Sequence, residues 1–133
     1  MGEFTQIHEN TKVDNLIHIA HNVIIGPESF IIACSEISGS AVFGKGIWYA
    51  PNACCNPEII LGDYTFVGTG AVVTKDTKPF SLVFGNPAKH FGWMCKCQKY
   101  RLTFEQDHTA SCKCGRKYKI EADNVYLTED LTP

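Results

Sequence analysis

Apolar side chains return at every sixth position between residues 7 and 73. A period of six fits neither an α-helix of 3.6 residues per turn nor the alternation of a hairpin sheet, and a fixed period over many repeats is typical of a solenoid. The pattern therefore predicts a parallel β-helix. The positions are Ile7, Val13, Ile19, Ile25, Ile31, Ile37, Phe43, Tyr49, Cys55, Leu61, Val67 and Val73.

Prolines mark the corners of the predicted coils. Pro27, Pro51 and Pro57 each follow an apolar position by two residues. Because proline cannot donate a ladder hydrogen bond, this position predicts the turn between short strands. Three corners make a coil of 18 residues, so the pattern predicts about four coils of triangular cross-section. Spacing does not give the hand of the coil, for which the general rule is right-handed crossovers.

The residue before each apolar position must point outward, since strand side chains alternate. Taken one coil apart, these residues form three columns, of which two are apolar. A soluble monomer seldom exposes such patches, so the columns favour packing of copies around a three-fold axis. The alternative is that a C-terminal tail covers one face. The columns are Lys12, Phe30, Trp48 and Phe66; Ile24, Val42 and Ile60; and His18, Glu36, Cys54 and Val72.

The six-residue repeats and their turns, over residues 5 to 94, resemble the hexapeptide-repeat acyltransferases of bacteria. The similarity lies in the segments VIIGPES, IILGDYT, FVGTGAVVTKD and VFGNPAK. The run TKVDNLIHIAHNVIIG is similar to UDP-3-O-acylglucosamine N-acyltransferases. The ending FGNPAKHFGWM is similar to acetyl-CoA-dependent N-acetyltransferases of nucleotide-linked amino sugars. The resemblance implies left-handed coils and a homotrimer.

The overall composition fits a small domain with an appendage. The chain has 133 residues, of which 44% are hydrophobic, enough for a core. We expect a β-helix domain over 5–92 and a cysteine-rich tail over 93–128. Relatives usually carry further coils or a sugar-binding domain, so a truncated or minimal version stays open. With no membrane-span pattern and no signal-peptide pattern, we expect no membrane span and a cytoplasmic location.

Charge is concentrated in one segment, although the net charge is only −2. Ten of the twelve Lys and Arg residues lie between residues 75 and 119. The simplest interpretation is a solvated surface. A sharper one is phosphate binding, to coenzyme A or to a nucleotide-sugar. No aromatic-interleaved basic motif accompanies the segment, so we expect no nucleic-acid partner.

His21 is the leading catalytic candidate. It occupies a corner beside the apolar Ile24 column, and imidazole exchanges protons readily near neutral pH. One coil later, about 4.8 Å along the ladder, the same corner is Gly39. Without a side chain there, the Gly39 N–H is open to a reacting carbonyl oxygen. The resemblance to the motif IAHN implies that His21 is the general base and that the Gly39 amide stabilises the oxyanion. It also makes Asn22 a positioning residue, with a plain turn asparagine as the equal alternative.

A metalloenzyme is the less favoured interpretation of the histidines. Some left-handed β-helices are carbonic anhydrases that hold zinc between subunits. His8 and His18, however, belong to different corners and faces from His21, and the carboxylate and third-histidine pattern of that family is not found. We expect His8 and His18 to be surface residues or supports of the site.

The candidate cofactor-binding residues lie in and after the last six-residue repeats. In relatives this segment runs beside the adenine end of coenzyme A. The resemblance therefore implies cofactor binding by the five residues that match its motifs, and an ordinary solenoid cap is the equal alternative. They are Gly68, Thr74, Lys75, Pro87 and Lys89.

Two cysteine pairs, separated by 14 residues, follow the ladder. Four thiolates on two turns are what a tetrahedral zinc site requires, and a cytosolic protein seldom keeps them as disulfides. They predict a structural zinc in a ribbon-like appendage, with an iron-bound or metal-free tail as alternatives. We expect no catalytic thiol. The pairs are Cys95 with Cys97 and Cys112 with Cys114.

The resemblance implies transfer of an acetyl group from acetyl-CoA to the amine of a nucleotide-linked amino sugar, as in cell-surface polysaccharide synthesis. One alternative is long-chain N-acyl transfer from acyl carrier protein in lipid precursor synthesis. The chain, however, has a cysteine ribbon where a carrier-docking helix would follow the coils. A non-catalytic solenoid scaffold is the other alternative.

Overall fold

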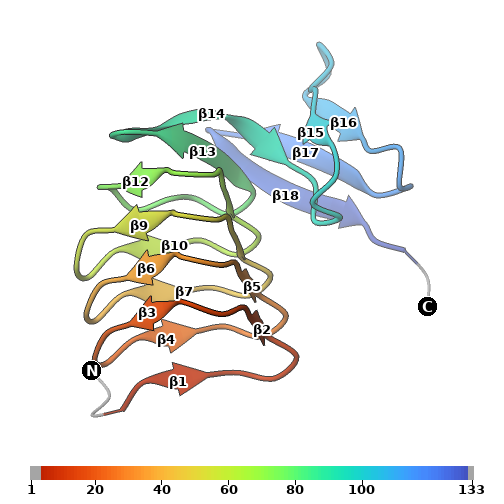
Figure 1. Ribbon diagram of the computed structural model, residues 1–133. Coiled ribbons are helices and arrows are strands. Elements are labelled where there is room, and N and C mark those ends of the chain that lie inside the picture. Colours follow the sequence, from red (N-terminus) through yellow and green to blue (C-terminus); the bar gives the residue numbers. More distant parts are fainter. Residues whose placement is uncertain (1–3, 132–133) are drawn as a thin grey trace.

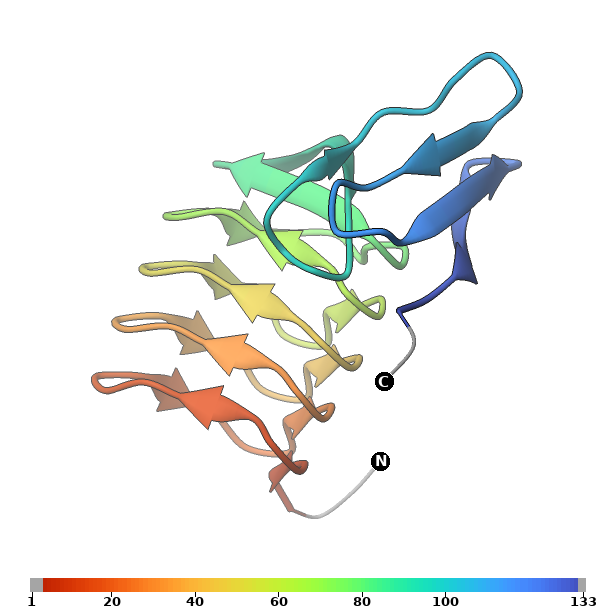
Figure 2. The ribbon, with the colours of Figure 1, turned by 90° about the vertical axis from the view of Figure 1, so that its right-hand side faces the viewer.

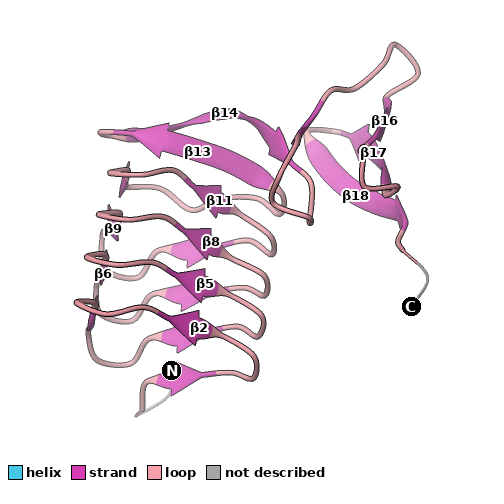
Figure 3. Cartoon of the chain, turned by 45° about the vertical axis from the view of Figure 1, so that its right-hand side comes forward, coloured by secondary structure: helices cyan, strands magenta, loops and turns pink. Residues whose placement is uncertain are grey.

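The computed structural model describes residues 4–131. In this part of the chain all regular secondary structure is β (Figure 3), which confirms the predicted all-β class. Figure 1 shows stacked coils with a separate group of strands beside the last coil. The described residues include no helix long and apolar enough to cross a membrane.

The stack consists of two-residue strands, one in each hexad of the sequence. They are β1 (Gln6–Ile7), β2 (Lys12–Val13), β3 (His18–Ile19), β4 (Ile24–Ile25), β5 (Phe30–Ile31), β6 (Glu36–Ile37), β7 (Val42–Phe43), β8 (Trp48–Tyr49), β9 (Cys54–Cys55), β10 (Ile60–Leu61), β11 (Phe66–Val67) and β12 (Val72–Val73).

On two of the three faces, each strand from β1 to β8 pairs in parallel with the strand 18 residues later, as Ile24 does with Val42. Backbone hydrogen bonds join successive coils, such as Lys12 N–H to Ser29 O at 2.8 Å. The first face consists of β1, β4, β7 and β10, and the second of β2, β5, β8 and β11. The third consists of β3 beside β6 and β9 beside β12. This confirms the predicted triangular solenoid of about four coils.

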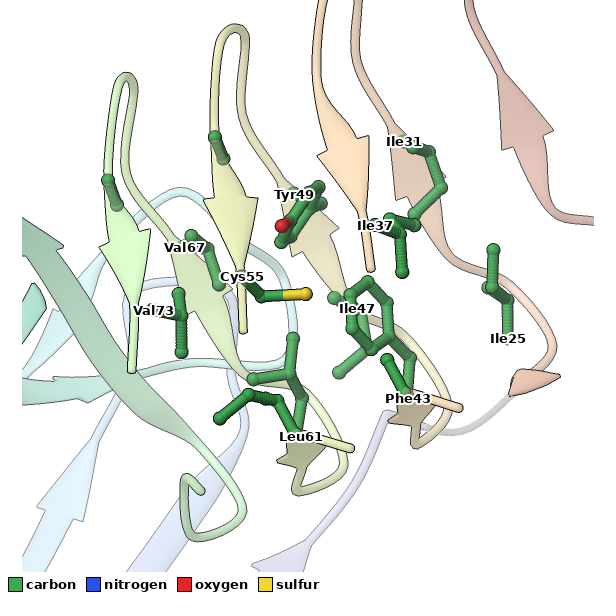
Figure 4. Close-up of a cluster of buried hydrophobic side chains, with 14 of the residues drawn as sticks. Ile25, Ile31, Ile37, Phe43, Ile47, Tyr49, Cys55, Leu61, Val67 and Val73 are labelled. Carbon is green, nitrogen blue, oxygen red and sulfur yellow. The ribbon is translucent and has the colours of Figure 1, made fainter. Parts of the chain in front are cut away.

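The inward positions form the core of the stack (Figure 4). Ile25, Ile37 and Tyr49 are completely buried. Ile7 and Val13 belong to the first described coil and are 48% and 42% exposed, as expected at the end of a stack. Burial of apolar surface between coils, at roughly 25 cal/mol per Å², is the main stabilising term of such a solenoid.

Corner residues have left-handed backbone conformations. The second residue of each turn has φ near +60°, as in Asn22 (57°) and Gly46 (64°). Asn and Gly adopt this region at low cost, whereas bulky side chains do not. Tyr64 (61°) and Phe80 (65°) are therefore unfavourable corner residues by local preference.

The predicted outward columns are present, and both apolar columns remain accessible in the single chain. Phe30 is 38% exposed, and Trp48 stacks on Phe66 with ring centroids 5.5 Å apart. Ile60, in the other apolar column, is 50% exposed. The C-terminal strands thus leave a large part of these two faces uncovered.

The last coil leads into a hairpin and then a small sheet. β13 (Ser81–Gly85) pairs in parallel with β11 and turns back into β14 (Ala88–Met94), which pairs with β15 (Arg101–Leu102). β16 (Thr109–Ser111), β17 (Lys117–Glu121) and β18 (Asn124–Glu129) form an antiparallel sheet (Figure 2). A second apolar cluster joins this sheet to Phe80, Cys95 and Leu102. The expected boundary between residues 92 and 93 falls within β14, and the division into 5–92 and 93–128 stays a prediction.

Candidate functional site

The His21 corner has the geometry expected from the coil spacing. The imidazole of His21 lies directly over Gly39, so that a Cβ atom added to Gly39 would be 2.6 Å from His21 Nε2. The Ser40 N–H donates to the His21 carbonyl at 2.9 Å and fixes the two turns to each other. Within residues 4–131, the Gly39 N–H makes no backbone hydrogen bond. An exposed imidazole and an open amide thus share one corner.

The other candidates, Asn22, His18 and His8, have less support from the structure. Asn22 occupies the left-handed turn position, which a turn asparagine alone explains, and its positioning role stays a prediction. His18 pairs in register with Glu36 on the third face. His8 and His18 are both exposed. Within one described chain, the three histidines do not belong to any group arranged to hold a metal.

A pocket of about 760 Å³ opens where the last coil meets the β13–β14 hairpin and the segment that follows it. This C-terminal segment, from residue 93 onward, is called the ribbon below. Four of the five predicted cofactor residues line it. The fifth, Gly68, is not among the lining residues, and its N–H donates to the Val83 carbonyl at 2.8 Å on the neighbouring strand. The four are Thr74, Lys75, Pro87 and Lys89.

Sequence reasoning missed other lining residues, namely Lys78, His90, Trp93 and Asp123. The rings of His90 and Trp93 meet edge to face at 4.4 Å. Burial, together with the Lys78 ammonium, lowers the pKa of His90, and Asp123 opposes this. The concentration of lysines after residue 74 was a signal for this pocket, but no repeat pattern extends to these positions.

The four cysteines of the tail converge. Their sulfur atoms all lie within 4.8 Å of one another, with Cys95 Sγ 3.6 Å from Cys114 Sγ and Cys97 Sγ 3.7 Å from Cys112 Sγ. In a tetrahedral site with zinc–sulfur bonds of about 2.3 Å, the sulfurs lie about 3.8 Å apart. The cluster therefore has the size of a metal site, and it is the one such group among the described residues.

The cationic side chain of Arg116 contacts the sulfur cluster. Burial raises the pKa of Cys95. Burial also acts to raise that of Cys114, but hydrogen bonds from Arg116 and Cys112 outweigh it and lower the value to about 6. The Arg116 side chain donates to Cys114 Sγ at 3.6 Å, and Asp130 joins Arg116 to Lys96 through ion pairs of 2.7 and 3.0 Å. The Arg116 guanidinium thus places positive charge beside one sulfur of the cluster.

Known proteins resemble a large part of the chain. The chain is 37% identical, over 99 residues, to a dTDP-3-amino-3,6-dideoxy-alpha-D-galactopyranose 3-N-acetyltransferase of Aneurinibacillus thermoaerophilus, covering 74% of this chain and 46% of that protein. It is 33% identical, over 85 residues, to a UDP-3-O-acylglucosamine N-acyltransferase of Campylobacter lari, covering 64% and 27%. No protein-family model matches the sequence.

Solved structures agree on the fold. A hexapeptide-repeat acetyltransferase of Vibrio cholerae superposes with a TM-score of 0.64 at 20% identity, covering 68% of this chain and 63% of that one. The same acetyltransferase with acetyl-coenzyme A gives 0.56 at 18% identity, covering 70% and 73%. The expected similarity to hexapeptide-repeat acyltransferases and their β-helix is confirmed. The chain spans less than half the length of the two relatives named above.

Proposed function

We propose that this chain transfers an acetyl group from acetyl-CoA to the amine of a nucleotide-linked amino sugar, for cell-surface polysaccharide synthesis. The observation that carries the proposal is the exposed His21 imidazole lying over Gly39. Both relatives are, by name, N-acetyl- or N-acyltransferases of sugars carried by a nucleotide, which supports the acceptor class.

The chemistry follows from the corner. The amine nitrogen attacks the thioester carbonyl while His21 accepts the amine proton, and the Gly39 N–H donates to the oxyanion of the tetrahedral intermediate. Collapse of the intermediate breaks the carbon–sulfur bond. The imidazolium then protonates the departing thiolate, so the products are the N-acetyl sugar and coenzyme A. Asn22, beside His21, would orient the acceptor.

The pocket at the last coil is the proposed site for the phosphorylated end of acetyl-CoA. Lys75 lies on the same corner as His21, three coils later, which is about 14 Å at the spacing of adjacent strands. An extended pantetheine arm along this corner would join the pocket to Gly39. Lys75 and Lys89 supply positive charge for the phosphates, and Thr74 and Pro87 line the walls. Gly68 does not line the pocket, and its proposed role is carried out by the backbone of the neighbouring turn.

We further propose a homotrimer in the cytoplasm. The two exposed apolar columns need a partner surface, and a three-fold assembly of identical chains supplies one. The His21 corner adjoins the Ile24 column, so a neighbouring subunit would wall the site. Acetyl-CoA and reduced cysteines both fit a cytosolic environment.

The four-cysteine cluster is the proposed site of one structural zinc ion in a ribbon-like appendage. Cys95, Cys97, Cys112 and Cys114 supply four sulfur ligands, the set typical of a closed, non-catalytic zinc site. Zinc would provide much of the folding energy of this short segment.

Donor competition tests the activity. The purified protein is assayed by mass spectrometry with acetyl-CoA and with long-chain acyl carrier protein, against nucleotide-linked amino sugars. Acetylated product from acetyl-CoA is expected. Product from the carrier protein alone would establish the lipid alternative. Failure of the folded protein to bind coenzyme A by calorimetry would instead favour a scaffold.

A further inference from the structure

The ribbon is fixed to the solenoid by a stack of aromatic rings. Tyr64 and Phe80 are corner residues of successive coils, and their ring centroids are 5.3 Å apart. Phe80 in turn meets Tyr118 of β17 edge to face, also at 5.3 Å. The Phe80 ring is thereby held between Tyr64 of the coils and Tyr118 of the ribbon. These contacts give the ribbon a defined position on the last coils.

The same tyrosine reaches the cysteine cluster. Tyr118 is completely buried, and its Oη lies 3.0 Å from Cys95 Sγ. The Lys96 N–H donates to Tyr118 Oη at 3.0 Å, which leaves the phenol proton free to be donated to the sulfur. One side chain thus contacts both a candidate metal ligand and the aromatic stack of the solenoid.

The other end of β17 reaches the pocket. Five residues after Tyr118, at the turn between β17 and β18, Asp123 forms part of the pocket lining. Its backbone carbonyl accepts a hydrogen bond from Lys78 Nζ at 3.1 Å. The ammonium group of Lys78, a cation of the pocket, is therefore held by the ribbon and not by the solenoid from which it comes.

We propose that the ribbon is a wall of the donor pocket, and that metal bound by its four cysteines positions Lys78 for a phosphate group of coenzyme A. The metal fixes the position of Cys95, which contacts Tyr118. Tyr118 belongs to β17, which leads to the turn with Asp123, and the Asp123 carbonyl in turn holds Lys78. Lys78 is thus a phosphate-binding residue whose placement depends on a metal site elsewhere in the chain. This inference rests on the proposed use of acetyl-CoA.

The test compares coenzyme A affinity, by calorimetry, in zinc-loaded and chelator-stripped protein. Stripping is expected to weaken binding about tenfold or more, the loss expected for a hydrogen bond to a charged group. In zinc-loaded protein, Lys78→Ala should weaken coenzyme A binding to a similar extent. Removing zinc from the Lys78→Ala variant should weaken binding little further, because the two changes remove one interaction. Lys99→Ala, which removes an exposed ribbon lysine outside the pocket, is the charge-matched control and should bind normally.

The outcomes separate this inference from the proposed function. Equal affinity with and without zinc, or full additivity of stripping and Lys78→Ala, overturns the inference and leaves acetyl-CoA use intact. Absence of binding in both forms overturns the proposed function as well. If stripped protein aggregates, Tyr118→Phe gives the same test with zinc in place. Its affinity should fall about threefold or more from loss of the hydroxyl contacts, and unchanged affinity counts against the proposal.

Discussion

His21 and Gly39 lie one above the other at a single corner, 18 residues apart, with the imidazole occupying the space that a Gly39 side chain would need. The ladder hydrogen bonds around this corner, including Ser40 N–H to His21 O at 2.9 Å, set the separation of the two turns. The position of the imidazole therefore depends on the absence of a Cβ atom in the next coil.

Gly39→Ala should lower kcat without unfolding the protein. The added methyl would lie 2.6 Å from His21 Nε2 and must push the exposed ring away from its place. Displacement of a catalytic group by about 1 Å can cost about 10²-fold in rate. Steady-state kinetics checks the loss. In a His21→Ala background the same substitution should cost far less, since the displaced ring is already gone. Equal losses in both backgrounds would contradict the steric account.

His21→Ala should reduce kcat by roughly 10²–10⁴ if the imidazole is the general base. Its side chain is exposed in the single chain, so the melting temperature should change little. His18→Ala, an exposed histidine on the adjoining face, is the control and should retain its rate. A folded His21→Ala protein with unchanged kcat would mean that the amine arrives already deprotonated and needs no base.

The fold was largely predictable because a solenoid repeats one local rule. Inward residues such as Ile25 and Ile37 are completely buried, and the corner prolines fall in turns. The same periodicity placed His21 and Gly39 at one corner. The repeat ends after Val73. Beyond it the spacing of apolar residues does not predict the hairpin of β13 and β14.

The pocket and the ribbon contacts were less predictable for the same reason. Lys78, His90 and Asp123 lie up to 45 residues apart in sequence and meet only through tertiary packing. Tyr64 and Phe80 are poor turn residues by local preference, and the stacking of Tyr64 on Phe80 and of Phe80 on Tyr118 could not be read from the sequence. The cysteine cluster, by contrast, was predictable, since the spacing of cysteines in the sequence indicates a metal site without knowledge of the packing.

Assembly should depend on the exposed apolar columns. We expect light scattering to give the mass of a trimer, and Ile60→Lys to reduce it, because a charge would be buried at a face where the wild-type residue is 50% exposed in the single chain. Leu131→Lys, at an exposed position near the C-terminal end of the described chain, is the matched control. A monomeric wild-type protein that is fully active would refute the trimer.

The purified protein should contain about one zinc ion per chain. The sulfur separations of 3.6 and 3.7 Å match a tetrahedral site, and the ribbon has too small an apolar cluster to order itself. Elemental analysis checks the metal. Chelation should make residues 95–120 sensitive to protease while the coils stay folded, since each coil is held by its neighbours. Cys112→Ser should act like chelation, whereas Cys34→Ser, at an exposed solenoid corner, should keep the metal. Cleavage appearing first within residues 5–92 would show that the ribbon and the coils unfold as one unit.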